Sequence, residues 1–99
     1  MDTQTEILDF LHAHKQFLQK RFHLSKIALF GSFARGEASK ESDVDILIEL
    51  QNDVENIYDL KYELKEFLSK NFHRKVDIAR EKYLKPYAKD IILKDALYV

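Results

Sequence analysis

Hydrophobic residues recur every three to four positions in some segments of this chain and gather in short or alternating runs in others. The first pattern predicts amphipathic helices and the second predicts strands. The first helix is predicted from Thr3 or Thr5 to about Arg21, because threonine caps helix N-termini and the apolar positions that follow share a helical period. Those core-facing positions are Ile7, Leu11, His14, Leu18 and Phe22. The chain therefore opens on one amphipathic helix.

Short apolar runs and further helical spacings predict the rest of the fold. Strands are expected at 26–30, 43–50, 75–79 and 96–99. Helices are expected at 33–36, at 56–70, and from Pro86 to about 93, with polar loops at 37–42 and 51–55. This order predicts an α/β fold in one small domain over residues 1–99, because a chain of this length has room for a single core.

A Gly-Ser pair follows the first expected strand, and an Asp-Val-Asp triplet opens the second strand after ten intervening residues. Gly31 lets backbone amides approach a phosphate because it has no Cβ, and the Ser32 hydroxyl adds a donor. Asp43 and Asp45 share one face of their strand, roughly 7 Å apart along it. Carboxylates beside substrate phosphates are the usual ligands of Mg²⁺. The spacing thus couples a phosphate-binding turn to a metal-binding strand, as nucleotidyl transfer requires.

Two segments, Leu29–Gly36 and Ser42–Ile48, resemble the DNA polymerase β-type nucleotidyltransferase superfamily, whose motif is G-S followed at this spacing by D-x-D. The similarity is greatest to the minimal nucleotidyltransferases, or MNT proteins, of prokaryotes. It implies a small mixed sheet whose helices cover the face away from the site. It also implies a third carboxylate on a neighbouring strand, which Asp77 matches.

The same resemblance assigns roles to six residues. Asp43, Asp45 and Asp77 would be the catalytic carboxylates and would hold Mg²⁺, with two ions expected. Gly31, Ser32 and Arg35 would bind the nucleotide. MNT proteins act as antitoxins to a HEPN ribonuclease encoded beside them, so the implied function is AMPylation: transfer of AMP from ATP to a hydroxyl, expected to be a tyrosine, of such a toxin.

Two alternatives stay open for the function. The chain could be a non-catalytic antitoxin or subunit that acts by binding alone. It could also be a small-molecule nucleotidyltransferase that works with a separate substrate-binding chain. If the chain is an enzyme, its acceptor is expected on another molecule, because 99 residues leave no room for a second domain to hold it.

Composition excludes several other classes of protein. Sixteen Lys and Arg nearly cancel seventeen Asp and Glu, for a net charge of −1, so strong nucleic-acid binding is not expected. The absence of cysteine removes disulfides and thiolate chemistry. Nothing resembles a signal peptide or membrane span, which makes the cytoplasm the expected location. The four histidines lack the compact spacing of a metal site.

Simpler interpretations exist for individual residues. Either aspartate of the triplet could be an ordinary strand-start residue, and Asp77 could be a solvated edge-strand residue. Ser32 could be a helix N-cap, and Arg35 could pair with Glu37 or Glu41. The basic residues of the last third are interpreted as a solvated face rather than a binding patch: Lys70, Arg74, Lys75, Arg80, Lys82, Lys85 and Lys89. The tyrosines are interpreted mostly as packing on helix flanks, although any exposed one could accept AMP: Tyr58, Tyr62, Tyr83, Tyr87 and Tyr98.

Overall fold

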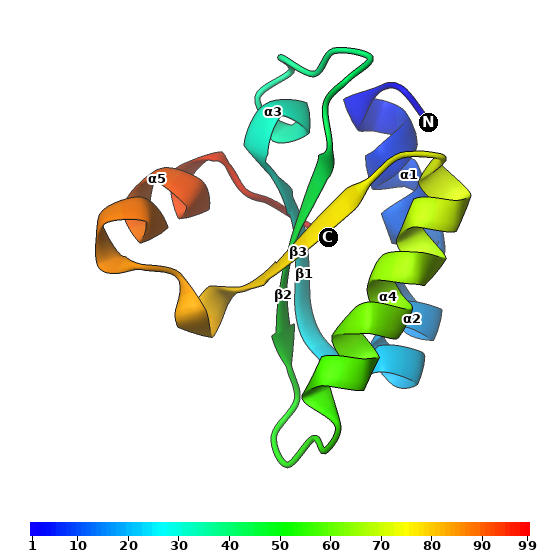
Figure 1. Ribbon diagram of the computed structural model, residues 1–99, viewed down its shortest axis with the longest axis vertical. Coiled ribbons are helices and arrows are strands. Elements are labelled where there is room, and N and C mark those ends of the chain that lie inside the picture. The colour runs from blue at the N-terminus through cyan, green and yellow to red at the C-terminus, as the bar shows by residue number, and fades with distance from the viewer.

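A four-stranded sheet in the order β3-β2-β1-β4 runs through the molecule, with helices on both of its faces (Figure 1). The computed structural model describes residues 1–99. The N-terminal half contains α1 (Gln4–Ala13), α2 (Lys15–Phe22), β1 (Leu24–Phe30), α3 (Gly31–Ala34) and β2 (Val44–Leu50). The C-terminal half contains α4 (Ile57–Phe72), β3 (Val76–Arg80), the 3₁₀ helix η1 (Glu81–Tyr83), α5 (Pro86–Asp95) and β4 (Leu97–Tyr98).

Strand pairing brings three chain segments to one end of the sheet. β1 pairs antiparallel with β2, so the end of β1 meets the start of β2, and Phe30 lies opposite Asp45. β3 runs parallel to β2 after the α4 crossover, and Asp77 lies opposite Asp45. β4 adds antiparallel to the other side of β1. The predicted α/β fold with a mixed sheet is confirmed.

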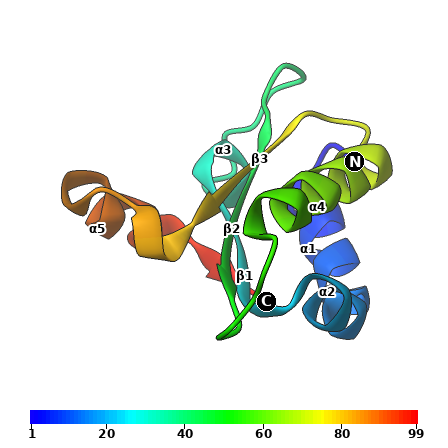
Figure 2. The same cartoon turned by 60° about the horizontal axis from the view of Figure 1, so that its bottom comes forward.

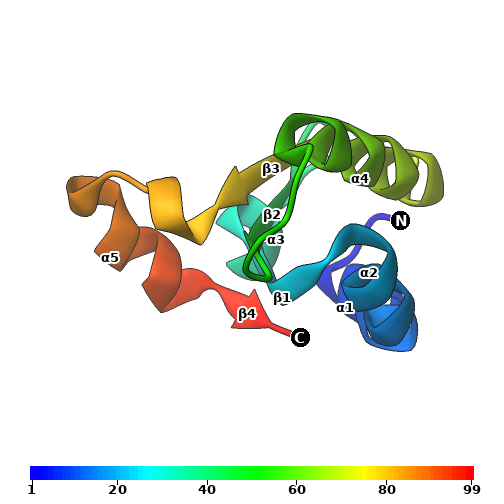
Figure 3. The ribbon, with the colours of Figure 1, turned by 90° about the horizontal axis from the view of Figure 1, so that it is seen from below.

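The helices divide unequally between the two faces of the sheet. α1, α2 and α4 lie together on one face (Figure 2), where the main core includes Ile46, Ile48 and Leu68. α5 lies on the opposite face (Figure 3), on which Ala28 and Leu47 are also buried. The helices therefore cover the face away from Asp45, as the resemblance implied, with α5 as the exception. None of the helices has the length and apolar character needed to span a membrane.

The first predicted helix is wrong in one respect, because the chain turns at His14 and forms two helices. Thr3 caps α1 as predicted, and its side chain accepts a hydrogen bond from the Glu6 amide at 3.1 Å. At His14 the backbone has φ −106° and ψ 11°, outside the helical range. The His14 ring stacks on Phe10 at 4.1 Å and bonds the Phe10 carbonyl through Nδ1 at 2.9 Å. This side-chain contact accompanies the turn.

Candidate active site

The three predicted carboxylates come together at the end of the sheet where β2 and β3 begin. Asp43 immediately precedes β2, and Asp45 lies two residues later on the same face. Asp77 is the register partner of Asp45 on β3, which places their side chains on one face of the parallel pair. Asp43 and Asp45 are half-buried, whereas Asp77 is exposed at the sheet edge. The structure therefore gathers the residues that the sequence separates by more than thirty positions.

Gly31 is needed here for two independent reasons. Its φ of +73° lies in the left-handed region, which side chains disfavour. A Cβ at this position would also lie 2.1 Å from Oδ2 of Asp45, far inside van der Waals contact. The prediction attributed this glycine to phosphate approach, but within the protein its hydrogen leaves room for the Asp45 carboxylate. Gly36 has a similar φ of +72°, with open space where its Cβ would be.

The electrostatics of the cluster are those of crowded negative charges. Burial raises the pKa of Asp45 above its ordinary value, and the negative charges of Asp77 and Asp43 raise this pKa further. The nearby Arg35 guanidinium acts in the opposite direction. Only one cation contacts the cluster directly, since Lys75 Nζ lies 3.9 Å from Oδ2 of Asp43 and is largely exposed. The site thus holds more negative charge than the protein itself neutralises.

The donor set fits Mg²⁺ only when a substrate completes it. No three side chains of the His, Cys, Asp or Glu type form a group that could hold a metal ion by themselves. Magnesium is usually bound by one or two carboxylates together with waters and substrate phosphates, so a closed protein cage is not required. Asp45 supplies a carboxylate that lies directly against the Gly31 backbone, beside the predicted phosphate turn. These oxygen donors are of the right chemical type for the ion.

Two predicted nucleotide-binding residues lie in and just after the turn that follows β1. Ser32 is the second residue of α3, and Phe30 occupies the N-cap position, so the N-cap interpretation of Ser32 is wrong. The short helix was expected at 33–36 but begins at Gly31. Arg35 donates from Nε to Glu37 at 3.1 Å, as its simpler interpretation predicted. Its Nη1 also lies 3.9 Å from Oδ2 of Asp95, a contact that was not predicted. Its side chain remains 43% exposed.

Arg74 organises the loop between the Gly-Ser turn and Asp43, a role that no sequence pattern predicted. Its Nη1 donates to the carbonyl oxygens of Ser39, Lys40 and Ser42 at 2.9–3.2 Å. Its guanidinium also lies 5.0 Å from the centre of the Phe33 ring. With 9% of its side chain exposed, Arg74 is no part of a solvated basic face. The interpretation of the C-terminal basic residues is wrong for Arg74.

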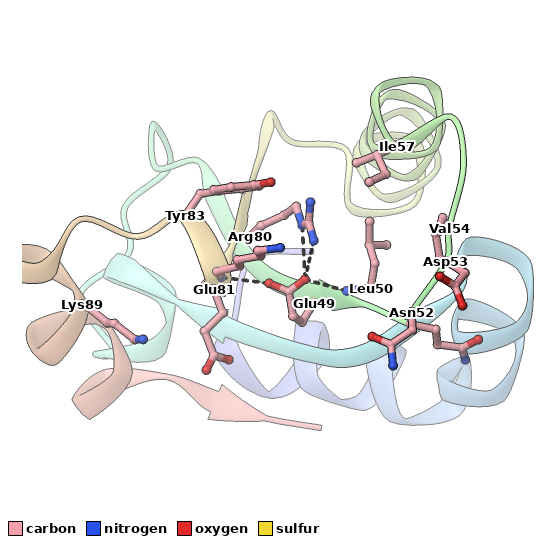
Figure 4. Close-up of a pocket in the computed structure, with 12 residues that line it drawn as sticks. Glu49, Leu50, Asn52, Asp53, Val54, Ile57, Arg80, Glu81, Tyr83 and Lys89 are labelled. Atoms are coloured by element: carbon pink, nitrogen blue, oxygen red, sulfur yellow. Dashed lines mark hydrogen bonds and ion pairs between the residues drawn. The ribbon is translucent and has the colours of Figure 1, made fainter.

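Arg80 is the second exception among these basic residues, because it is paired with Glu49 at the far end of β2. Glu49 accepts from Arg80 at 2.8 and 3.2 Å and from the backbone N–H of Leu50 and Lys82 (Figure 4). The Arg80 side chain is 11% exposed. Both residues line a pocket of about 450 Å³ that also contains Lys82, Tyr83 and Lys89.

All five tyrosines are exposed, so the prediction that they mostly pack on helix flanks is wrong. The exposed fractions range from 47% at Tyr98 to 84% at Tyr58. Tyr98 is the least exposed of the five and donates its hydroxyl to Glu81 at 3.0 Å; its partial burial together with this carboxylate raises the pKa of Tyr98 to about 12. The remaining four have no such partner.

Comparison with known protein sequences shows similarity to nucleotidyltransferases. A family model described as nucleotidyltransferase domain matches residues 11–99. The protein adenylyltransferase MntA of Thermococcus cleftensis is 38% identical over 100 aligned positions, which cover 100% of this chain and 98% of that protein.

Solved structures agree with this family match. A structure provisionally described as a minimal nucleotidyltransferase superposes with a TM-score of 0.73 and 30% identity, over 91% of this chain and 93% of that one. A toxin-antitoxin crystal structure with AMP-PNP shares the fold, with a TM-score of 0.68 and 22% identity over 87% and 69% of the two chains. The matched region includes the Gly-Ser turn and all three carboxylates, and the chain belongs to the nucleotidyltransferase domain family.

Proposed function

We propose that this protein transfers AMP from ATP to a hydroxyl of a partner toxin and thereby neutralises it. The observation that carries the proposal is the convergence of Asp43, Asp45 and Asp77 beside the Gly31-Ser32 turn. The name of the MntA relative, a protein adenylyltransferase, supports transfer to a protein. The toxin-antitoxin fold neighbour with AMP-PNP supports ATP as the donor and a toxin as the partner.

The finer part of the proposal concerns the acceptor. We take it to be a tyrosine hydroxyl of a HEPN-type ribonuclease, which follows from the resemblance to MNT antitoxins. Because ATP is the donor, we place the reaction in the cytoplasm. A partner of this kind brings its own acceptor, so this chain has to position the triphosphate and receive an acceptor side chain at the same end of the sheet.

Each site residue has a distinct task in this proposal. Asp43 and Asp45 would hold Mg²⁺ with the triphosphate, and Asp77 would hold a second ion nearer the acceptor. Bound Mg²⁺ supplies neutralisation of phosphate charge and lowers the pKa of the acceptor hydroxyl. The Gly31 and Ser32 amides and the Ser32 hydroxyl orient the phosphates. Arg35 has free N–H donors and enough exposure to swing from Glu37 towards an anionic oxygen.

Intact mass spectrometry of the partner tests the function directly. The purified protein, ATP and MgCl₂ are incubated with the HEPN-type protein of the same organism, and the parent should add one or more AMP units. Asp45→Asn should add none. Inhibition of the ribonuclease without any gain in mass would instead favour the non-catalytic antitoxin. Release of pyrophosphate with a free small-molecule acceptor, and no gain on the protein, would favour the small-molecule enzyme.

A further inference from the structure

A groove between α4 and the outer edge of the sheet includes Asp77, one of the three predicted site residues, in its lining. Its volume is about 290 Å³, and its lining residues are Tyr58, Lys61, Tyr62, Lys65, Asp77 and Ile78. The first four follow the spacing i, i+3, i+4, i+7, so they form one stripe along α4. The last two come from β3, the edge strand. Asp77 therefore belongs both to the groove and to the carboxylate cluster.

The aromatic and basic side chains of this groove are exposed or free of ion pairs. Tyr58 and Tyr62 are 84% and 59% exposed, which is unusual for large aromatic side chains and typical of binding surfaces. None of the ion pairs of the molecule includes Lys61 or Lys65. The groove therefore offers two aromatic rings and two free ammonium groups to a partner.

The strand that forms the other wall of the groove can also pair with a partner. β3 is bonded to β2 on one side and has no strand on the other. The outer edge of such a strand carries backbone N–H and C=O groups that an extended peptide can pair with, while alternate side chains enter neighbouring pockets. An extended segment along β3 would carry its side chains past the lysines and end beside Asp77.

We propose that this groove binds an extended acidic segment of the protein partner, paired with the edge of β3, and so delivers the acceptor hydroxyl to Asp77. The inference rests on the proposed function and adds the recognition of its protein substrate. Lys61 and Lys65 supply the charge complementarity. Single-stranded nucleic acid also stacks on aromatic rings beside lysines. Two lysines next to the negative Asp77, in a chain of net charge −1, favour an acidic peptide over a phosphate backbone.

Fluorescence anisotropy with labelled peptides tests the groove without requiring the natural partner. The probes are a peptide of alternating Glu and Tyr, a peptide of alternating Lys and Tyr, and an oligoadenylate RNA, each with the full chain in MgCl₂. The parent should bind the acidic peptide about tenfold more tightly than the basic one, which corresponds to about 1.4 kcal/mol from two lysines. Lys61→Glu/Lys65→Glu should abolish or reverse this preference.

A matched double variant controls for net charge. Lys20→Glu/Lys70→Glu makes the same charge change at exposed positions outside the groove, and it should keep the parental preference. Lys and Glu have similar helix propensities, so all these variants should fold, as circular dichroism will verify. Equal affinity of the parent for the two peptides overturns the proposal. So does an identical effect of the two double variants, or tighter binding of the RNA than of the acidic peptide.

Failure of the groove and failure of the proposed function have different signatures. Asp45→Asn should bind the acidic peptide like the parent while it transfers no AMP to the HEPN-type protein. If Lys61→Glu/Lys65→Glu transfers AMP with the parental KM for that protein, the groove proposal is wrong and the function stands. If Asp45→Asn transfers AMP at the parental rate, the function is wrong whatever the peptides show.

Discussion

The carboxylates at the two ends of β2 have pKa values that are shifted in opposite directions. Asp45 near the start and Glu49 near the end lie on the same face of one strand. At Asp45, burial and the neighbouring Asp77 and Asp43 raise the pKa. At Glu49, burial acts in the raising direction too, but hydrogen bonds from Arg80, from the Leu50 amide and from the Lys82 amide outweigh it, and the pKa is lowered.

This difference separates a structural carboxylate from the one that we propose to be catalytic. Glu49 accepts four hydrogen bonds of 2.8–3.2 Å, of which the two from Arg80 and the one from Lys82 join β2 to β3 and η1. Asp45 faces two other carboxylates, and the fold gives it no such partner. Two like charges at about 5 Å repel by roughly 3 kcal/mol at an effective dielectric of 20. Clustered carboxylates that lower the stability of the unliganded protein indicate a site that binds a cation.

The largest expected effect is the loss of activity when the functional end is neutralised. Asp43→Asn and Asp45→Asn should each lower the rate of AMP transfer at least about 100-fold, because metal-assisted charge stabilisation contributes several kcal/mol and 1.4 kcal/mol is tenfold. Radiolabelled AMP transfer to the HEPN-type protein measures this. Glu49→Gln is the matched control, and it should retain most of the rate. Near-parental transfer by either aspartate variant would contradict the assignment.

The next largest effect concerns the glycine beside Asp45. Gly31→Ala should cost roughly 2–5 kcal/mol, the sum of left-handed backbone strain and overpacking against the carboxylate. Gly36→Ala has the same kind of backbone strain with open space around it, so it should cost only about 1–2 kcal/mol and keep most activity. Urea unfolding of the two variants gives the difference. Equal losses would show that the contact with Asp45 carries no energy.

The sequence predicted the fold and the Asp43–Asp45 pair because both depend on local patterns, whereas Asp77 was predicted through the family resemblance. Alternating apolar residues define β2, and the D-x-D spacing is visible without any partner. The sequence did not predict the turn at His14, since the helical stripe continues through that residue. It also gave no indication that Arg74 binds three loop carbonyls or that Arg80 pairs with Glu49. Those contacts join segments more than thirty positions apart, and in sequence an arginine that ends in a buried pair looks like any surface arginine.

A moderate effect is expected when the structural end is neutralised. Glu49→Gln should destabilise the protein by about 1.5–3 kcal/mol, the usual contribution of charge-assisted hydrogen bonds. Because the folded pKa of Glu49 is lowered, its contribution is present above the ordinary value of 4.5 and is lost as the pH falls through the lowered pKa. Denaturant unfolding at a series of pH values measures this. Glu66→Gln, at an exposed position on α4, should change little; an equal loss there would contradict the role of Glu49.

The smallest effect has the opposite sign and provides the sharpest test of the comparison. The raised pKa of Asp45 means that the folded protein loses stability as the pH rises from about 3.8 through that raised value, so a penalty persists at neutral pH. Asp45→Asn removes the penalty and should raise the melting temperature in EDTA by roughly 2–4 °C, the shift for about 0.5 kcal/mol after solvent screening. The gain should vanish below pH 3.8. With MgCl₂ and ATP the order should reverse, since only the parent gains stability by binding. A variant that melts lower than the parent in EDTA, and gains as much from MgCl₂ and ATP, would place Asp45 with Glu49 among the structural carboxylates.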